Sequence, residues 1–177
     1  MERKRSKASP AQLLLQHRQI FQLSADTRVL DLACGSGRNG LWFAEYGAKV
    51  TFVDRDLSRL DAIPPNCYSL SFDLEAKHSL PPFDAQFDIV IIFNYLHRPL
   101  FEPLKRLIRP GGLIVYETFL TEQANVGRPK NPDFLLHPGE LMQVFDSFTP
   151  LHYFEGNVGC EQQPCFKAQL IARQTDS

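Results

Sequence analysis

The sequence has no apolar run that approaches the roughly 20 residues needed to span a bilayer as a helix. Its first residues, MERKRSKASP, are charged and no long apolar segment follows them, so we expect no secretory signal. Neither sign of charge dominates, because 19 Lys and Arg are matched by 20 Asp and Glu, for a net charge of −1. These features argue against a membrane protein and against attraction of nucleic acid by overall charge, and they predict a cytoplasmic protein.

The sequence also has few cysteines, and they do not form a metal-binding pattern. The four are Cys34, Cys67, Cys160 and Cys165. Cys160 and Cys165 are separated by four residues, and no second pair of His or Cys completes a site, so we expect no metal centre. Reduced thiols are the expected state, with a redox-active pair of Cys160 and Cys165 as the alternative.

What is present is typical of one globular domain. The chain has 177 residues, of which 44% are hydrophobic and 22% charged, and it contains no internal repeat or low-complexity block. We expect a polar, basic, flexible tail over residues 1–8 and a single domain over 9–177. Ser9 to Gln12 has the form of a capping box with Pro10 at the first helical position, which predicts a helix carrying His17.

The stretch from Arg28 to Asp56 has the pattern of a βαβ unit. An apolar run leads through three closely spaced glycines into a segment with apolar residues at helical spacing, and a second apolar run ends at Asp54. About thirty residues is the length at which a crossover helix joins two parallel strands. Glycines in the turn let the backbone approach a ligand closely, and the helix start offers free N–H donors.

The glycine turn alone is compatible with a dinucleotide site. Gly35, Gly37 and Gly40 match G-x-G-x-x-G, and Asp54 lies about twenty residues on, where a ribose acceptor is expected. Asp31 argues against a pyrophosphate ligand, because a carboxylate just before the turn would repel it. A ligand with an ammonium group and a ribose but no phosphate fits both acidic residues, and S-adenosylmethionine is such a ligand.

At these residues the sequence resembles a known family. DLACGSGRN, from Asp31 to Asn39, is similar to motif I of class I S-adenosylmethionine-dependent methyltransferases, an acidic residue followed by x-G-x-G-x-G. Ala33 replaces the first of those glycines, and a residue this small still permits close approach. The CGxGRN form resembles the tellurite-resistance methyltransferase branch. The resemblance extends to about Arg173 and includes Arg109 to Gly112, an RPGG turn before an apolar strand.

The resemblance implies an α/β fold, a three-layer, doubly wound, mostly parallel seven-stranded sheet with a reversed last strand. The apolar patterns of the chain supply seven matching strands, the last two forming an antiparallel hairpin. They are expected at 28–33, 49–53, 67–72, 87–93, 113–119, 149–155 and 165–173. Further helices are expected at 39–46, 56–62, 99–108 and 138–145. Asp88 is expected to cap nearby backbone groups.

The resemblance also implies which residues hold the cofactor. Asp31 would hold the methionine ammonium, the glycine turn would pass beneath the amino acid and ribose, and Asp54 would take the ribose hydroxyls. Asp73 would accept a hydrogen bond from the adenine, although a helix cap is the alternative for that residue. The full predicted set is Asp31, Ala33, Gly35, Gly37, Asp54, Arg55, Asp73, Leu74 and Asn94.

Substrate contacts are expected after the strand at 87–93, because ligands of open α/β sheets bind outside the carboxyl ends of the strands. Asn94, Tyr95 and His97 are the predicted catalytic or substrate-side residues, and His97 could instead cap the next helix. Glu117 and Arg128 are further candidates by position. The segment 121–137 has no periodicity and is expected to be a lid, in which Arg128 and Lys130 would meet an anionic substrate and Phe134 would close over a small one.

The favoured function is therefore methyl transfer from S-adenosylmethionine to a small molecule, including a chalcogen oxyanion or a thiol. An RNA acceptor is the alternative, based on the basic tail and on Arg98, Lys105, Arg106 and Arg109. Two alternatives of other classes are an NAD-dependent oxidoreductase, suggested by the glycine spacing, and a protein that binds S-adenosylmethionine without catalysis. A monomer or a homodimer is expected.

Overall fold

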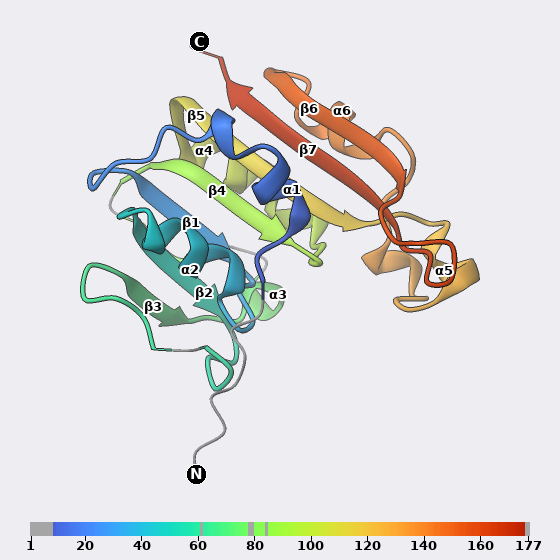
Figure 1. Ribbon diagram of the computed structural model, residues 1–177, viewed down its shortest axis with the longest axis horizontal. Coiled ribbons are helices and arrows are strands. Elements are labelled where there is room, and N and C mark those ends of the chain that lie inside the picture. The colour runs from blue at the N-terminus through green and yellow to red at the C-terminus, as the bar shows by residue number, and fades with distance from the viewer. Residues whose placement is uncertain (1–8, 61, 78–79, 84, 176–177) are drawn as a thin grey trace.

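The computed structural model describes residues 9–60, 62–77, 80–83 and 85–175. Its central element is a seven-stranded sheet with the order β3-β2-β1-β4-β5-β7-β6 (Figure 1). The strands are β1 (Arg28–Leu32), β2 (Lys49–Asp54), β3 (Tyr68–Ser71), β4 (Phe87–Phe93), β5 (Ile108–Phe119), β6 (Phe148–Asn157) and β7 (Phe166–Gln174). The predicted tail lies outside the described residues.

The sheet is parallel except around β7. The strands β3, β2, β1, β4 and β5 pair in parallel, whereas β7 lies antiparallel between β5 and β6. The order reverses at β1 and β4, which is the point where open α/β sheets bind ligands. The predicted doubly wound sheet with a reversed last strand is confirmed.

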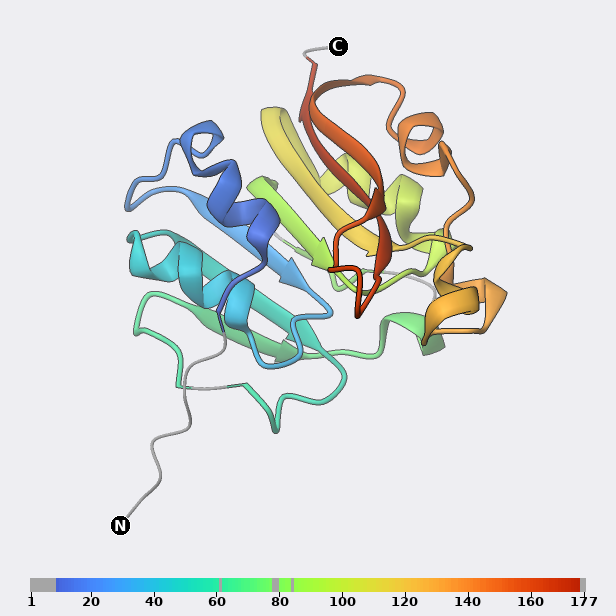
Figure 2. The ribbon, with the colours of Figure 1, turned by 45° about the vertical axis from the view of Figure 1, so that its right-hand side comes forward.

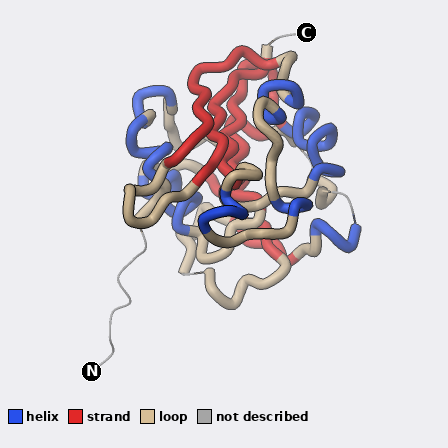
Figure 3. Tube along the Cα trace, turned by 90° about the vertical axis from the view of Figure 1, so that its right-hand side faces the viewer, coloured by secondary structure: helices blue, strands red, loops and turns tan. Residues whose placement is uncertain are grey.

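Helices cover both faces of the sheet (Figures 2 and 3). They are α1 (Gln12–Gln16), α2 (Arg38–Glu45), α3 (Leu74–Lys77), α4 (Phe101–Leu107), α5 (Gln123–Val126) and α6 (Glu140–Val144), with 3₁₀ turns at Arg18–Ile20, Arg98–Leu100 and Pro132–Phe134. Successive strand residues point to opposite faces, so Val29 packs with α1 and α2 whereas Leu30 packs with α4 and α6. A hydrophobic core thus lies on each face of the sheet, and together the two cores hold its carboxyl edge in place. No helix among the described residues is long and apolar enough to cross a membrane.

The first helix begins later than its sequence pattern predicts. The capping-box prediction is wrong, because α1 starts after Ala11, whose side chain offers no cap. The carbonyl of Ser9 accepts a hydrogen bond from Arg38 Nη1 at 2.8 Å, and the N–H of Ala11 donates to Asn39 Oδ1 at 2.9 Å. The segment before α1 is therefore tied to the start of α2. His17 lies just past α1, which ends at Gln16.

The predicted helix over 56–62 is also wrong. The carboxylate of Asp56 accepts a hydrogen bond from the backbone N–H of Ser58 at 2.9 Å, and Leu57 forms a turn with Leu60. An Asp side chain that binds the backbone two residues on stabilises a turn in competition with a helix.

Two further differences concern α4 and β5. The helix predicted over 99–108 begins with a 3₁₀ turn and becomes α-helical at Phe101. The residues Arg109 to Gly112 form no tight turn but an irregular start of β5, in which Gly111 has a φ of +74° and the pairing with β4 shifts register. Asp88 accepts hydrogen bonds from the backbone N–H of Arg28 and from Arg109 Nε, so its predicted capping role is confirmed.

Candidate cofactor and substrate site

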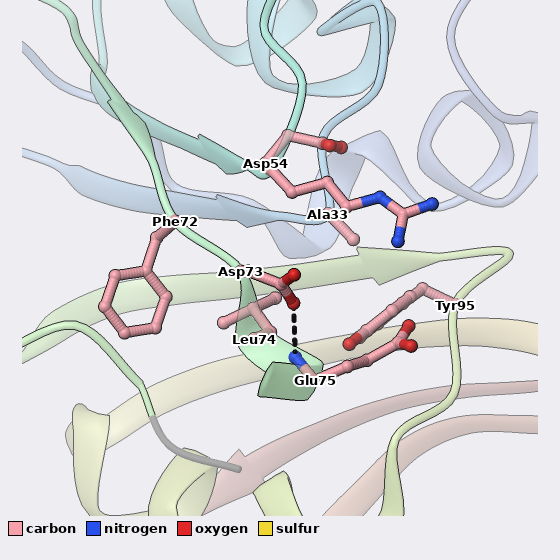
Figure 4. Close-up of a pocket in the computed structure, with 8 residues that line it drawn as sticks. Ala33, Asp54, Phe72, Asp73, Leu74, Glu75 and Tyr95 are labelled. Atoms are coloured by element: carbon pink, nitrogen blue, oxygen red, sulfur yellow. Dashed lines mark hydrogen bonds between the residues drawn. The ribbon is translucent and has the colours of Figure 1, made fainter. Parts of the chain in front are cut away.

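A cavity opens at the carboxyl ends of four neighbouring strands (Figure 4). Asp73 follows β3, Asp54 ends β2, Ala33 follows β1 and Tyr95 follows β4, in the same order as the strands themselves. The cavity has a volume of about 160 Å³, and its lining is completed by Arg55, Phe72, Leu74 and Glu75. Drug-sized ligands occupy pockets of about 300–1,000 Å³, so this cavity suits one part of a larger ligand, such as a heterocycle.

The turn after β1 is built to bring backbone close to this cavity. Ala33, Gly35 and Gly37 have positive φ values of 55°, 55° and 74°. A Cβ added at Gly35 would meet no atom within 4 Å, whereas one at Gly37 would lie 2.3 Å from Leu60 Cδ1. Gly35 therefore faces open space, and Gly37 is enclosed by protein.

Asp54 connects the end of β2 to this turn. Its Oδ2 accepts a hydrogen bond from the backbone N–H of Gly35 at 2.9 Å, and its Oδ1 accepts one from Asp56 N–H at 3.0 Å. A carboxylate has about four lone-pair sites, so two backbone donors leave it able to accept further hydrogen bonds from a ligand.

Asp31 lies beneath the turn rather than in the cavity. It is 3% exposed, and its Oδ2 accepts a hydrogen bond from Gly40 N–H at 2.9 Å. Burial raises the pKa of Asp31 to about 7, and Asp54 adds to this increase, while the Gly40 N–H and Arg38 oppose it. A cationic ligand group nearby would favour the ionised form.

The alternative expected for Asp73, a helix cap, is present. Its Oδ1 accepts hydrogen bonds from the backbone N–H groups of Glu75 and Ala76, both at 3.0 Å, and the bond from Ala76 lowers the pKa of Asp73 (Figure 4). Both bonds use one oxygen, so this role is compatible with a ligand contact. In Figure 4 the side chains of Asp73, Glu75 and Tyr95 turn toward one another, whereas the Phe72 ring points away.

Tyr95 brings an unsatisfied polar atom to the cavity. Its Oη is buried and has no hydrogen-bond partner among the described residues. Burial raises the pKa of Tyr95, and the carboxylates of Glu75 and Asp73 raise it further. The phenol therefore stays protonated at neutral pH and acts as a hydrogen-bond donor rather than as a base. An unpaired buried donor, an open glycine turn and acidic side chains in one cavity fit a ligand with adenine and ribose groups.

Of the other predicted substrate-side residues, neither Asn94 nor His97 lines this cavity. Asn94 follows β4 with a φ of +56°, is exposed, and its Oδ1 accepts a hydrogen bond from Lys167 Nζ at 2.6 Å. Glu117, a candidate by position, is buried, with Lys167 Nζ 2.8 Å from its Oε1 and Gln169 Nε2 2.7 Å from its Oε2. Both oxygens are engaged, so Glu117 is not placed to act as a free base.

Sequence reasoning missed Lys167 and Gln169. They lie on β7, about fifty residues from Glu117, and only the antiparallel pairing of β5 with β7 places them beside it. The available signal is their spacing: two polar residues at i and i+2 place two polar side chains on one face of an apolar strand.

His97 and Arg98 are adjacent in the chain but make different contacts. The side chain of His97 does not cap the following 3₁₀ turn, so that alternative is wrong, although its backbone carbonyl accepts a hydrogen bond from Leu100 N–H. Arg98 donates to both oxygens of Glu140, at 2.6 and 2.9 Å, and to the carbonyls of Asp133 and Leu135. Arg98 thus fixes the end of the 121–137 segment to α6.

The 121–137 segment contains structure that its sequence did not indicate, namely α5 and a 3₁₀ turn. Arg128, Lys130 and Phe134 line one shallow hollow in this segment, and Phe134 is 43% exposed. The arrangement brings together the predicted anion-binding and closing residues.

The cysteines are all free thiols, and Cys160 is exposed whereas Cys67 is buried. Among the described residues no three His, Cys, Asp or Glu side chains are grouped to hold a metal ion.

Comparison with known proteins shows which domains this chain resembles. Residues 29–112 match the model of a family described as a methyltransferase domain. This segment is just under half of the chain and is similar to a methyltransferase domain. The matched segment runs from β1 to the start of β5 and includes the whole cavity lining.

Individual relatives of the chain are also named as methyltransferases. A Bacillus subtilis protein named as a methyltransferase, YqeM, is 30% identical over 102 residues, which cover 51% of this chain and 41% of that protein. The chain spans 41% to 65% of the length of the first three curated relatives that it matches.

Solved structures share the fold. TehB from Haemophilus influenzae superposes with a TM-score of 0.71 at 20% identity, covering 92% of this chain and 61% of TehB. A Burkholderia thailandensis N1-methyltransferase, solved with bound 1,6-didemethyltoxoflavin and S-adenosylhomocysteine, superposes with a TM-score of 0.60 at 19% identity, covering 92% of this chain and 76% of that one. The Rossmann-like fold of these methyltransferases is therefore established for this chain.

Proposed function

We propose that the protein transfers the methyl group of S-adenosylmethionine to a small-molecule acceptor. The observation that carries this proposal is the cavity at the ends of β1 to β4, where Asp54, Asp73 and the unpaired Tyr95 phenol meet beside the glycine turn. This is the switch point of the sheet order, where α/β folds bind ligands.

The cofactor contacts follow from the positions of these groups. Asp54 takes the ribose hydroxyls, with Arg55 beside it, and the turn from Ala33 through Gly37 passes beneath the amino acid and ribose. Asp73 and Leu74 frame the adenine. Asp31 stabilises the methionine ammonium from below the turn, because its buried carboxylate gains from a nearby cation.

The cofactor supplies an activated methyl group when it is bound. The protein's own residues then align the acceptor and keep water out, and orientation of this kind can contribute up to about 7–11 kcal/mol. None of the predicted catalytic residues with a defined environment is an available base. Tyr95 stays protonated, and Glu117 is engaged by Lys167 and Gln169. These observations favour an acceptor that is already ionised or unprotonated at neutral pH.

A small acceptor is favoured over RNA. Three of the four basic residues considered for RNA are paired with carboxylates: Arg98 with Glu140, Lys105 with Glu102 and Arg109 with Asp88. Paired cations offer less charge to phosphates, whose contacts dominate RNA affinity. The N1-methyltransferase with the same fold acts on a small heterocycle bound in its structure, which is consistent with this choice.

Within the small-molecule class we retain chalcogen oxyanions and thiols as acceptors. The support is the CGSGRN turn and the similarity of fold to TehB. The expected cytoplasmic location is kept as part of this proposal.

The test is mass spectrometry of ligands that copurify with the protein, followed by an acceptor screen that measures S-adenosylhomocysteine. The panel contains tellurite, selenite, thiols, small amines, small carboxylates and total RNA. Copurified S-adenosylmethionine or its product, with turnover on a small acceptor, is the expected result. Binding without turnover on any acceptor would indicate a non-catalytic binding protein, and copurified NAD would overturn the proposal.

A further inference from the structure

A chain of contacting polar side chains, buried at Lys167, Glu117 and Gln169, begins at the carboxyl edge of the sheet, on the face that α1 and α2 cover. Lys167 lies between Asn94 Oδ1, at 2.6 Å, and Glu117 Oε1, at 2.8 Å. The side chains of Lys167 and Glu117 are 10% and 8% exposed. Gln169 extends the chain, because its Nε2 bonds to Glu117 and its Oε1 lies 3.1 Å from His152 Nε2. The ring of His152 in turn packs against that of His17, just after α1, with 4.1 Å between the ring centroids.

The direction of these hydrogen bonds is fixed by chemistry. An ammonium group only donates, so the side-chain oxygen of Asn94 faces Lys167 and its NH₂ group points away. A carboxylate only accepts, so Gln169 donates to Glu117 through Nε2 and presents its oxygen to His152. The orientation of the Asn94 amide is therefore determined without reference to any ligand.

The backbone of Asn94 is held as firmly as its side chain. Its N–H donates to the carbonyl of Glu117 at 2.8 Å, and its φ of +56° is a left-handed conformation that Asn adopts more readily than most residues. Asn94 is exposed, and the next residue is Tyr95, which lines the cofactor cavity. The NH₂ group is thus an oriented hydrogen-bond donor on the residue next to Tyr95 of the cavity lining.

The ion pair of Lys167 with Glu117 is not explained by stability. Removing two charges from water is costly, and buried pairs are often no better than apolar residues of the same size. Orientation of the Asn94 side chain is a role that would account for this buried ion pair. Lys167 also lies 5.0 Å from the centre of the Phe119 ring, which further limits its movement.

We propose that Lys167 is a positioning residue, which fixes Asn94 so that the Asn94 NH₂ group donates a hydrogen bond to an oxygen of the methyl acceptor. The acceptor class is a small molecule that carries an anionic oxygen, as in a carboxylate or an inorganic oxyanion. The second half of this inference rests on the proposed methyltransferase function. The contact between Lys167 and Asn94 does not.

The first measurement is an NMR spectrum of the ¹⁵N-labelled side-chain amides in the ligand-free protein. The Asn94 NH₂ signals are assigned by comparison with Asn94→Asp. We expect Lys167→Met to move them toward the values of a freely rotating amide, Lys167→Arg to retain most of the wild-type shift, and Lys105→Met, which removes a surface ion pair, to leave them unchanged. Identical Asn94 signals in Lys167→Met and wild type would overturn the positioning role.

The second measurement adds probes to protein saturated with S-adenosylhomocysteine. Sodium acetate represents carboxylates, selenite represents inorganic oxyanions, and methylammonium is the cationic control. We expect saturable shifts of the Asn94 side-chain amide and of the Tyr95 backbone amide with at least one anion. Followed through the Tyr95 backbone amide in both proteins, that anion should bind about tenfold more weakly to Asn94→Asp, where a carboxylate replaces the donor. Binding of acetate would indicate a carboxylate acceptor, and binding of selenite would indicate an inorganic oxyanion.

Failure of both anions to move the Asn94 signals, or a preference for methylammonium, would overturn the acceptor class. S-adenosylhomocysteine binding is recorded in the same samples. Its absence would count against the proposed function, while the ligand-free spectra would still decide the role of Lys167.

Discussion

The carboxylate of Asp54 accepts a hydrogen bond from the backbone N–H of Gly35 at 2.9 Å. This contact joins the end of β2 to the turn after β1, and so sets the distance between the two parts of the motif that are nineteen positions apart in the chain. It also orients the carboxylate toward the cavity that Ala33 and Tyr95 line. The same side chain therefore shapes the turn and is available to a ligand.

Replacement of Asp54 is expected to weaken cofactor binding strongly. Asp54→Ala removes the turn contact and the hydrogen bonds proposed to the ribose. Hydrogen bonds to charged groups are worth about 1.5–3 kcal/mol, so the dissociation constant for S-adenosylhomocysteine should rise about 10- to 100-fold. Isothermal titration calorimetry checks this. Asp26→Ala, which removes an exposed carboxylate bound to Lys49, is the control and should bind like wild type.

Asp31 should make the stability of the ligand-free protein depend on pH. Its pKa is about 7 in the folded protein and about 3.9 in an unfolded chain, so the unfolded state loses the proton first as pH rises. Asp31 therefore lowers stability progressively between about pH 4 and 7, and its effect is constant above that range. Asp31→Asn avoids this cost.

The stability advantage of Asp31→Asn over wild type should thus grow by on the order of 1 kcal/mol per pH unit in that window and then level off. Urea unfolding at pH 5, 6, 7 and 8 without ligand measures it. The same substitution should weaken binding of S-adenosylhomocysteine, because it removes the charge proposed to face the ammonium. A stability difference that is flat across the window would contradict the assigned environment of Asp31.

Two glycines of the motif should respond differently to alanine. A Cβ at Gly40 would lie 2.5 Å from Phe52 Cε1 and 2.7 Å from Asp31 Oδ2, so Gly40→Ala must displace buried groups and lower the melting temperature clearly. A Cβ at Gly35 meets open space, and its cost is the left-handed backbone, about 1–2 kcal/mol.

Gly35→Ala should therefore remain folded at 25 °C and lose affinity for S-adenosylhomocysteine, since its methyl group enters the space proposed for the cofactor. Circular dichroism melting and calorimetry separate the two effects. Gly35→Ala protein that binds as tightly as wild type would place the cofactor elsewhere.

The parts of the site that lie close together in the sequence could be predicted from it. Gly35 and Asp54 belong to one βαβ unit, and its geometry is set by local turn chemistry and by the pairing of β1 with β2. Lys167 and Glu117 meet only because β7 reverses beside β5, and no local pattern specifies which residues oppose one another across that pair.

Specific hydrogen bonds explain two errors in the secondary-structure predictions. Asp56 binds the backbone of Ser58 and so stabilises a turn where apolar spacing indicated a helix. Ser9 cannot cap α1, because its backbone and that of Ala11 are tied to α2. In both cases specific hydrogen bonds outweigh the helix-forming pattern of the sequence.

The cysteines offer a test of the packing around the turn. Burial raises the pKa of Cys34, with Asp31 and Asp54 raising it further, so its thiol should react slowly although it lies in the motif. Cys160 is exposed and should be alkylated first by iodoacetamide at pH 7.5. Peptide mapping by mass spectrometry reports the order. Modification of Cys34 before Cys160 would contradict the enclosed position of the Cys34 thiol.

The central claim is that the cavity at the ends of β1 to β4 binds S-adenosylmethionine. Calorimetric titration of the wild-type protein with S-adenosylhomocysteine, with NADH as the comparison ligand, tests it most directly. We expect saturable one-site binding of S-adenosylhomocysteine that Asp54→Ala weakens and Asp26→Ala does not, with no binding of NADH. Binding of NADH, or equal affinity of wild type and Asp54→Ala for S-adenosylhomocysteine, would contradict it.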